Sequence, residues 1–304
     1  MTSQTLRLCT FALMFFCLGL YSCEKQINLN ITTGAAQLVV DAEIETNLPP
    51  VVILTSSLGF FSTIDLSTVQ NSFVHGATVQ VTDGRQTIKL KEYSIDTGTN
   101  NKYYFYTVDT TGGLNFKNIL FGQVNHFYTL SIIYNGQTYT AFTKIPNPKP
   151  VDSMWVQPTT NANPKIPPGA MQLYVNYNDP DTPGNYVRYY TKRNHDAFYP
   201  GNNVFNDQVI NGNKVPDIGI AMGYNDIVNA NVDSLRYLFP GDTVVLKWCM
   251  IDHGVYNFWN TYAFAQRAVG NPFSSPINVV SNISNGALGV WAGYGSSFDT
   301  LVVK

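Results

Sequence analysis

The fold class is decided by the stretch Ala77–Lys91, ATVQVTDGRQTIKLK. Apolar and polar residues alternate on both sides of Asp83-Gly84, and such period-two alternation is typical of half-buried strands. Because alternate side chains of a strand point to the same face, the two valines are expected to share the core with Ile88 and Leu90. Asp-Gly suits a two-residue type I′ turn, in which both residues need positive φ. The stretch therefore predicts an antiparallel β-hairpin.

The same alternation recurs along the chain. Leu38–Glu45 alternates cleanly, and Tyr128–Phe142 predicts a second hairpin around Asn135-Gly136. Residues 172–177 and 186–191 flank a loop rich in turn formers and are expected to be neighbouring strands. Only 12% of the residues are charged, and Thr, Asn, Gly, Tyr and Phe are abundant. Short strands joined by turns, in such a composition, predict an all-β fold.

The run Pro146-Asn147-Pro148-Lys149-Pro150 separates two groups of strands. Proline has no backbone N–H to give to a sheet, so this run interrupts strand pairing. We place a domain boundary here and predict two tandem β-sandwich domains. Residues 37–147 are expected to form an immunoglobulin-like or transthyretin-like sandwich, and residues 148–304 a second one that is similar to fibronectin type III.

One helix is predicted in the second domain, near residues 253–269. Asp252 is a candidate N-cap, Gly270 follows the last turn, and Pro272 lies just beyond it. Between these signals, aromatic and apolar residues recur at helical spacing. This face is expected to pack on the second sheet; the alternative is that it lines a ligand groove.

The amino terminus has the form of a bacterial lipoprotein signal. Residues 1–22 contain one basic residue, Arg7, and no acid. An apolar run begins within them, at Leu8. At roughly a dozen residues, this run is too short to span the bilayer, which takes about 20. Leu20-Tyr21-Ser22-Cys23 resembles a lipobox, which predicts cleavage between Ser22 and Cys23 and lipid attachment to Cys23. Residues 23–36 are polar and predict a flexible tether.

An ordinary secretory signal, with Cys23 near the cut by chance, is the alternative. Under the lipoprotein hypothesis, Cys9 and Cys17 leave with the signal, and Cys23 is blocked by lipid. Cys249 then has no partner for a disulfide. It lies in an apolar strand, so we expect a buried and unreactive thiol.

The charge and the motifs exclude several classes of function. The formal net charge of −2 excludes a basic surface for nucleic acid. No phosphate loop, nucleophile elbow or paired zinc ligands occur, and His75, His126, His195 and His253 are scattered. We therefore assign no catalytic residue, no metal and no cofactor other than the covalent lipid.

One loop offers oxygen ligands. Asp179, Asp181 and Asn185 are weak candidates for a calcium site, because calcium takes six to eight oxygen ligands. The loop lacks the twelve-residue calcium-binding pattern, and Pro180 and Pro183 suit a rigid turn instead. We leave both interpretations open.

The order of these features resembles a family of Bacteroidota outer-membrane lipoproteins that is known as domain of unknown function 4249. The resemblance extends over nearly the whole mature chain. It is carried by Cys23-Glu24-Lys25, Leu38–Ala42, Gly76–Val79, Thr143–Pro146 with Val151-Asp152-Ser153, Asn178-Asp179-Pro180 with Asn185-Tyr186, Asn271-Pro272-Phe273, Ser281-Asn282-Ile283 and Asn285-Gly286. The resemblance implies an outer-membrane location and, in many relatives, a gene beside a TonB-dependent receptor. It implies no catalytic residues.

We accordingly expect a non-enzymatic outer-membrane lipoprotein that serves as an accessory or ligand-binding subunit of a TonB-dependent receptor. A surface adhesin or structural component of the cell envelope is the alternative. A hydrolase is the least favoured hypothesis, because no nucleophile with its base can be picked out. Neither the ligand nor the oligomeric state follows from the sequence, and the lipid anchor leaves open which face of the membrane carries the protein.

Overall fold

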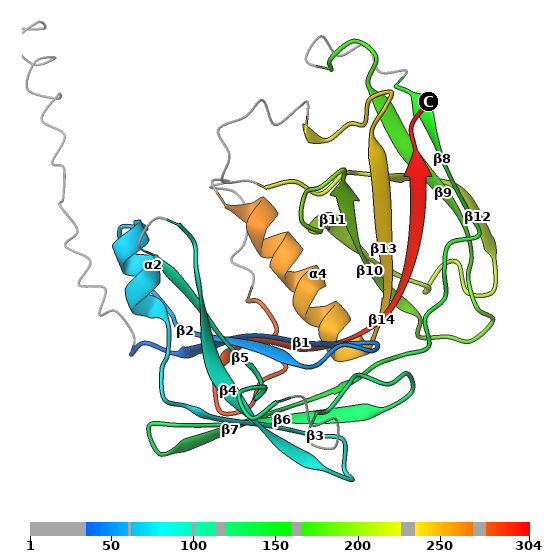
Figure 1. Cartoon of the computed structure of the whole chain (residues 1–304). Coiled ribbons are helices and arrows are strands. Elements are labelled where there is room, and N and C mark those ends of the chain that lie inside the picture. The colour runs from blue at the N-terminus through cyan, green and yellow to red at the C-terminus, as the bar shows by residue number, and fades with distance from the viewer. Residues whose placement is uncertain are drawn as a thin grey trace, which may run out of the picture. The chain divides into compact units, whose positions relative to one another are not determined.

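The computed structural model describes residues 35–59, 62–98, 101–113, 119–159, 166–225, 235–269 and 278–304. The predicted signal peptide, Cys23 and the predicted tether as far as residue 34 lie outside these ranges. The described strands are β1 (Leu38–Glu45), β2 (Val51–Ser56), β3 (Thr78–Thr82), β4 (Thr87–Asp96), β5 (Lys102–Val108), β6 (Phe127–Tyr134), β7 (Gln137–Lys144), β8 (Ser153–Pro158), β9 (Met171–Asn178), β10 (Tyr186–Arg193), β11 (Tyr199–Asn206), β12 (Lys214–Ile220), β13 (Thr243–Ile251) and β14 (Leu288–Val302). The described helices are α2 (Leu66–Ser72) and α4 (His253–Ala268). The predicted all-β fold is confirmed (Figure 1).

The strands form a large sheet and a small one. The large sheet has the order β11-β10-β13-β14-β1-β2-β5-β4-β3-β6-β7, and the small sheet has the order β12-β9-β8. Strand β14 joins the two halves of the large sheet. Its first half pairs in parallel with β1, and its second half pairs antiparallel with β13. Residues 288–302 therefore form one continuous strand that belongs to both halves.

The first core lies among β1 to β7. Alternate residues of these strands, from Leu38 to Ile145, form one buried cluster, and Trp291 of β14 joins it. The indole N–H of Trp291 donates to the carbonyl of Tyr128 at 3.0 Å. A large side chain from the end of the chain thus completes the core built by its first half.

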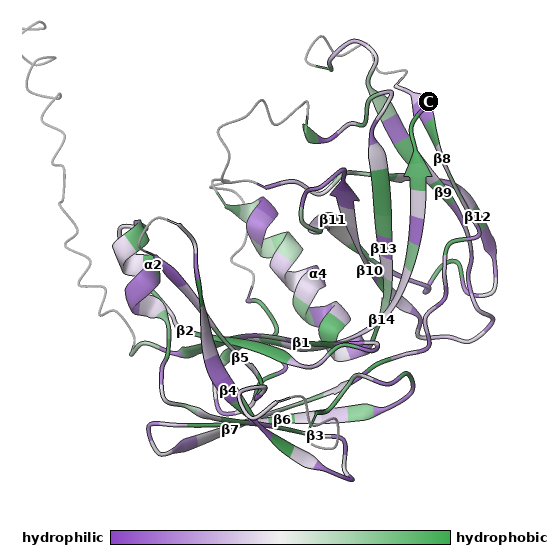
Figure 2. Cartoon of the chain, in the orientation of Figure 1, coloured by the Kyte–Doolittle hydropathy of each residue, from purple (hydrophilic) through white to green (hydrophobic). Residues whose placement is uncertain are grey.

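The second core lies between the small sheet and β10, β13 and β14. It contains Val175 of β9, Val187 of β10 and Trp248 of β13. In Figure 2 the apolar colour runs along β13, which has a buried residue on both of its faces. The predicted neighbouring strands, β9 and β10, contribute to the same core but belong to different sheets. Both strands alternate, and alternation does not specify a partner.

A third cluster lies on the opposite face of β10, β13 and β14, under helix α4. Val255 and Phe258 of α4 pack there against Ile251, Val290 and Ala292. The prediction that the helix packs on a sheet of the second half of the chain is confirmed. The strands that it covers belong to the large sheet. Neither described helix is long and apolar enough to cross a membrane.

The hairpin predicted around Asp83-Gly84 is confirmed, but its turn is not of the predicted type. Val79, Val81, Ile88 and Leu90 are all buried. Thr82 pairs with Thr87, so four residues form the loop, and Gly84 is the one with positive φ. The Asp83 carboxylate accepts hydrogen bonds from the backbone N–H groups of residues 85 and 86, which widens the turn. The Asn135-Gly136 turn, in contrast, has positive φ at both residues, as predicted.

The predicted boundary near residue 147 coincides with the change from the first core to the second. However, β1 and β14 belong to one sheet, and Ala36–Lys304 forms one compact unit by Cα proximity. The division into two domains stays a prediction. Helix α2 was not predicted, since it is short and has no buried residue.

Candidate binding pocket beside helix α4

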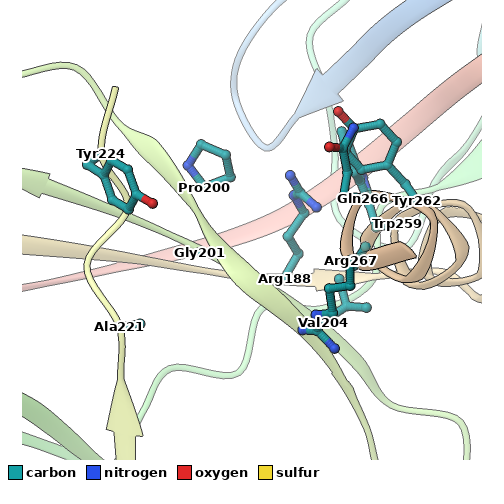
Figure 3. Close-up of a pocket in the computed structure, with 11 residues that line it drawn as sticks. Arg188, Pro200, Gly201, Val204, Ala221, Tyr224, Trp259, Tyr262, Gln266 and Arg267 are labelled. Atoms are coloured by element: carbon teal, nitrogen blue, oxygen red, sulfur yellow. The ribbon is translucent and has the colours of Figure 1, made fainter. Parts of the chain in front are cut away.

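A pocket of about 560 Å³ lies between helix α4, strands β10 and β11, and the segment after β12. This volume is in the range of small-molecule sites. Figure 3 shows the Arg188 side chain rising between Pro200 on one side and the helix on the other. The lining consists of Arg188, Pro200, Gly201, Val204, Ala221, Tyr224, Trp259, Tyr262, Ala263, Gln266 and Arg267. Two guanidinium groups and three aromatic rings are among them, and no carboxylate is.

Helix α4 forms one wall because of its aromatic face. The Asp252 side chain caps the helix by accepting from the Val255 N–H at 2.9 Å. Trp259 lies one turn after the buried Val255, so its ring packs at the edge of the third cluster. Tyr262 is 41% exposed and extends this aromatic face toward solvent. The alternative from the sequence, that this helix face lines a ligand groove, is therefore supported by a cavity beside the helix.

Arg188 forms the floor of the pocket. It lies opposite Cys249 in the β10–β13 register, on the face that α4 covers, and only 7% of it is exposed. Its guanidinium carbon lies 3.4 Å from the centroid of the Trp259 ring, a close cation–π contact. This stacking fixes the plane of the guanidinium.

A chain of hydrogen bonds holds Arg188 from below. Its Nε–H donates to the Tyr190 hydroxyl at 3.0 Å, and that hydroxyl donates to Tyr294 at 3.1 Å. The Trp259 indole N–H donates to the same Tyr294 oxygen at 3.2 Å. The stacked ring and the guanidinium are thus positioned by one shared network.

The positive charge of Arg188 is not neutralised by a contact. Burial raises the pKa of both Tyr190 and Tyr294, so these phenols are neutral at physiological pH. No ion pair among the described residues includes Arg188. Its electrostatic partners are Asp41 and Glu43 of β1, which it does not contact. Desolvation raises the pKa of both carboxyl groups, and the charge of Arg188 opposes that rise.

The calcium candidates lie in one loop, and two of them, Asp179 and Asn185, form hydrogen bonds there. Asp179 is buried and accepts from the Gly212 N–H at 3.2 Å. The Asn185 side-chain N–H groups bond to Thr182 and to Asp207, which is also buried and which sequence reasoning missed. Among the described residues, no group of three or more His, Cys, Asp or Glu side chains is placed to hold a metal ion. A calcium site at Asp179, Asp181 and Asn185 stays a prediction.

Sequence reasoning did not single out Arg188. A signal was available in Tyr186-Val187-Arg188-Tyr189-Tyr190, where an arginine stands in an otherwise aromatic and apolar strand. Such an arginine is unusual in a buried strand, because charged side chains are rarely fully buried without a partner. Cys249, in contrast, is fully buried as predicted, and its pKa is raised to about 12 by burial.

Comparison with known proteins supports the resemblance found in the sequence. The model of the family described as domain of unknown function (DUF4249) matches residues 24–298. The chain therefore belongs to this family. A search of curated proteins found no match.

Proposed function

We propose that this protein is a non-enzymatic lipoprotein of the outer membrane, held by lipid on Cys23, that serves as an accessory or ligand-binding subunit of a TonB-dependent receptor. The observation that carries the proposal is the order of segments in the chain. A signal with a lipobox is followed by a short polar segment, and the first strand begins at Leu38. Two or more acyl chains anchor a protein stably, whereas one does not.

The pocket beside α4 supports a binding role over a catalytic one. Among the described residues, its lining offers cations, aromatic rings and one amide, and contains no Ser, Cys, His, Asp or Glu. A hydrolytic site needs a nucleophile or an acid–base pair within reach of the substrate. Recognition needs only shape, apolar surface and a few polar groups.

Purification of the tagged chain from native membranes under mild detergent tests the proposal. A barrel receptor of the TonB-dependent class is expected to co-purify with the wild-type chain. The Cys23→Ser variant is the control, because it keeps the folded part and removes the acyl acceptor; it is expected to lose both the membrane and the receptor. Recovery of the wild-type chain without a receptor, together with its loss from whole cells under added protease, would favour a surface adhesin instead.

A further inference from the structure

Arg188 is a buried cation with unused hydrogen-bond donors. Of its five N–H groups, the one on Nε donates to Tyr190, and no acceptor among the described residues is bonded to Nη1 or Nη2. A buried guanidinium without a counter-ion is costly, and proteins usually provide a carboxylate for it. At this position the nearest open space is the pocket. The missing acceptor is therefore expected to arrive with a ligand.

The orientation of Arg188 limits the shape of that acceptor. Trp259 covers a face of the guanidinium, and Tyr190 takes the Nε–H. What remains is the edge that carries Nη1 and Nη2, which offers parallel donors in one plane. A carboxylate matches this edge with its two coplanar oxygens.

The rest of the lining describes the body of the ligand. Trp259, Tyr262 and Gln266 lie together on the helix side of the pocket, and Tyr224 lies across it, beyond Pro200. Flat apolar side chains bind the faces of sugar rings and aromatic rings alike. Arg267 at the end of α4 adds a second guanidinium group to the lining and disfavours a cationic ligand.

We propose that the Arg188 pocket binds a small molecule in which a carboxylate is attached to a ring, with the carboxylate on Nη1 and Nη2 of Arg188 and the ring against Trp259 and Tyr262. The assignment deepens the proposed function, since it names the ligand class of a binding subunit. A sugar acid and an aromatic acid share this chemistry. The experiment separates these two sources.

Calorimetric titration of the full chain in detergent solution tests the assignment. Galacturonate and benzoate are the two ring carboxylates, acetate lacks the ring, and galactose lacks the charge. At least one ring carboxylate is expected to bind with a Kd of about 1 mM or tighter, and acetate and galactose at least ten times more weakly. The ring acid that binds with the higher affinity identifies the source of the ligand.

Variants link the binding to named side chains. Arg188→Lys keeps a positive charge but not the paired donors. It is expected to weaken binding of the ring carboxylate about tenfold or more. Tyr262→Ala changes an exposed residue, so the fold is retained, and it is expected to weaken ring carboxylates without affecting acetate. Val209→Ala, at a site that is 90% exposed and outside the pocket, is the matched control.

Three results would overturn the assignment. The first is no binding of either ring acid; the second is affinity that neither Arg188→Lys nor Tyr262→Ala changes; the third is inorganic phosphate binding as tightly as the ring acids. None of these depends on lipid or receptor. A chain that binds ring carboxylates but co-purifies with no receptor would retain the ligand class and lose the proposed partner.

Discussion

Two buried cations on the same face of the large sheet differ in their partners. Lys247 of β13 forms an ion pair with Glu45 of β1, and both side chains are almost fully enclosed. Arg188 has no such carboxylate. Lys247 and Arg188 lie on adjacent strands, so a carboxylate partner is possible for a cation buried at this depth. Lys247 has such a partner for stability, and Arg188 does not. The contrast is the reason to regard Arg188 as a binding residue.

Loss of Lys247 is expected to destabilise the fold strongly. Lys247→Met leaves the buried Glu45 carboxylate without its partner, and a broken buried pair typically costs about 3–5 kcal/mol. Burial alone lowers the pKa of Lys247, but the charge and the hydrogen bond of Glu45 oppose burial, and the pKa of Lys247 is raised. The contribution is therefore present at neutral pH and is lost only as pH rises through the raised pKa. Urea unfolding is therefore expected to show the same loss in Lys247→Met at every pH from about 6 to about 9.

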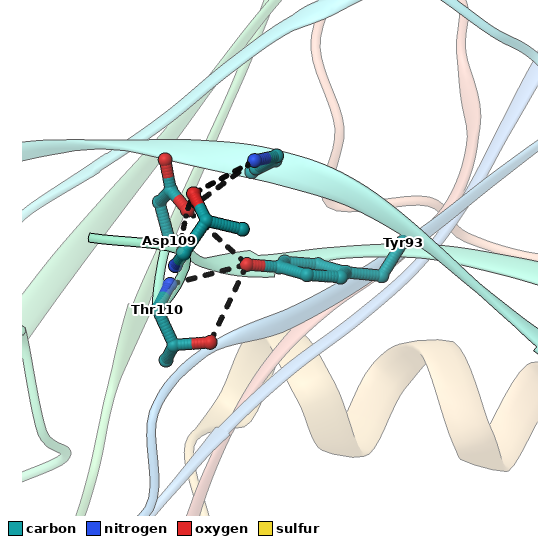
Figure 4. A network of polar contacts seen from close by, with 5 residues as sticks. Tyr93, Asp109 and Thr110 are labelled. Carbon is teal, nitrogen blue, oxygen red and sulfur yellow. Dashed lines mark hydrogen bonds and ion pairs between the residues drawn. The ribbon is translucent and has the colours of Figure 1, made fainter. Parts of the chain in front are cut away.

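A double variant separates the pair from its surroundings. Lys247→Met combined with Glu45→Leu removes both charges and is expected to recover most of the loss, because an apolar pair of similar size is tolerated there. Lys91→Met is the surface control. Lys91 lies 3.5 Å from the exposed Asp109, whose contact with Tyr93 is shown in Figure 4, and its loss is expected to change the urea midpoint little. A double variant that is no more stable than Lys247→Met would contradict this account.

At the scale of elements, one carboxylate joins helix α4 to the first group of strands. Asp252 caps the helix with one oxygen, and its other oxygen accepts from the Thr143 hydroxyl at 2.6 Å and from the Lys144 N–H at 2.9 Å. Both partners lie at the end of β7. The wall of the pocket is thus held in place by an element from the other core.

Asp252→Ala is expected to cost about 2–4 kcal/mol, because it removes a helix cap and leaves two partly buried donors unpaired. Chemical denaturation gives the loss in unfolding free energy. Asp65→Ala is the matched control, since Asp65 caps the short helix α2 through the Thr68 N–H and contacts no other element. Its effect on the urea midpoint is expected to be much smaller. Equal effects of the two changes would mean that Asp252 acts only as a cap.

Local signals in the sequence predicted most elements but not their partners. Alternation and Asn-Gly or Asp-Gly turns were sufficient for the hairpins, and the Asp252 cap was sufficient for α4. The pairing of β1 with β14 joins residues about 250 positions apart, and no local pattern encodes it. The pocket was missed for the same reason, because Arg188, Trp259 and Tyr224 come from three separate segments.

At the scale of the whole molecule, β14 passes close to the chain that leads from the first core to the second. A Cβ atom on Gly295 would lie 2.1 Å from the carbonyl oxygen of Pro146, so only glycine fits this crossing. Gly295→Ala is expected to destabilise the protein by about 2–3 kcal/mol, since backbone must move. Gly112→Ala is the control, because nothing lies within 4 Å of a Cβ there; it is expected to stay within about 1 kcal/mol of wild type. Thermal unfolding compares the two.

The chemistry of the cysteines links the folded part to the anchor. The chain has four cysteines, and Cys249 is the one within the described residues. Its thiol is buried, and burial raises its pKa to about 12, so almost no thiolate is present at pH 8 and none is accessible. If Cys9 and Cys17 leave with the signal and Cys23 carries a thioether-linked lipid, no other thiol is available.

Protein purified from native membranes is therefore expected to show no thiol toward a maleimide at pH 8 under native conditions, and a single one, Cys249, after denaturation. Cys249→Ala is the control and is expected to show none in either state. A thiol that reacts under native conditions and persists in Cys249→Ala would place a free sulfur at Cys23, since the buried position could not supply it. Mass spectrometry of the amino-terminal peptide would then distinguish a cleaved but unlipidated chain from an uncut one, and either result would remove the anchor on which the proposed function depends.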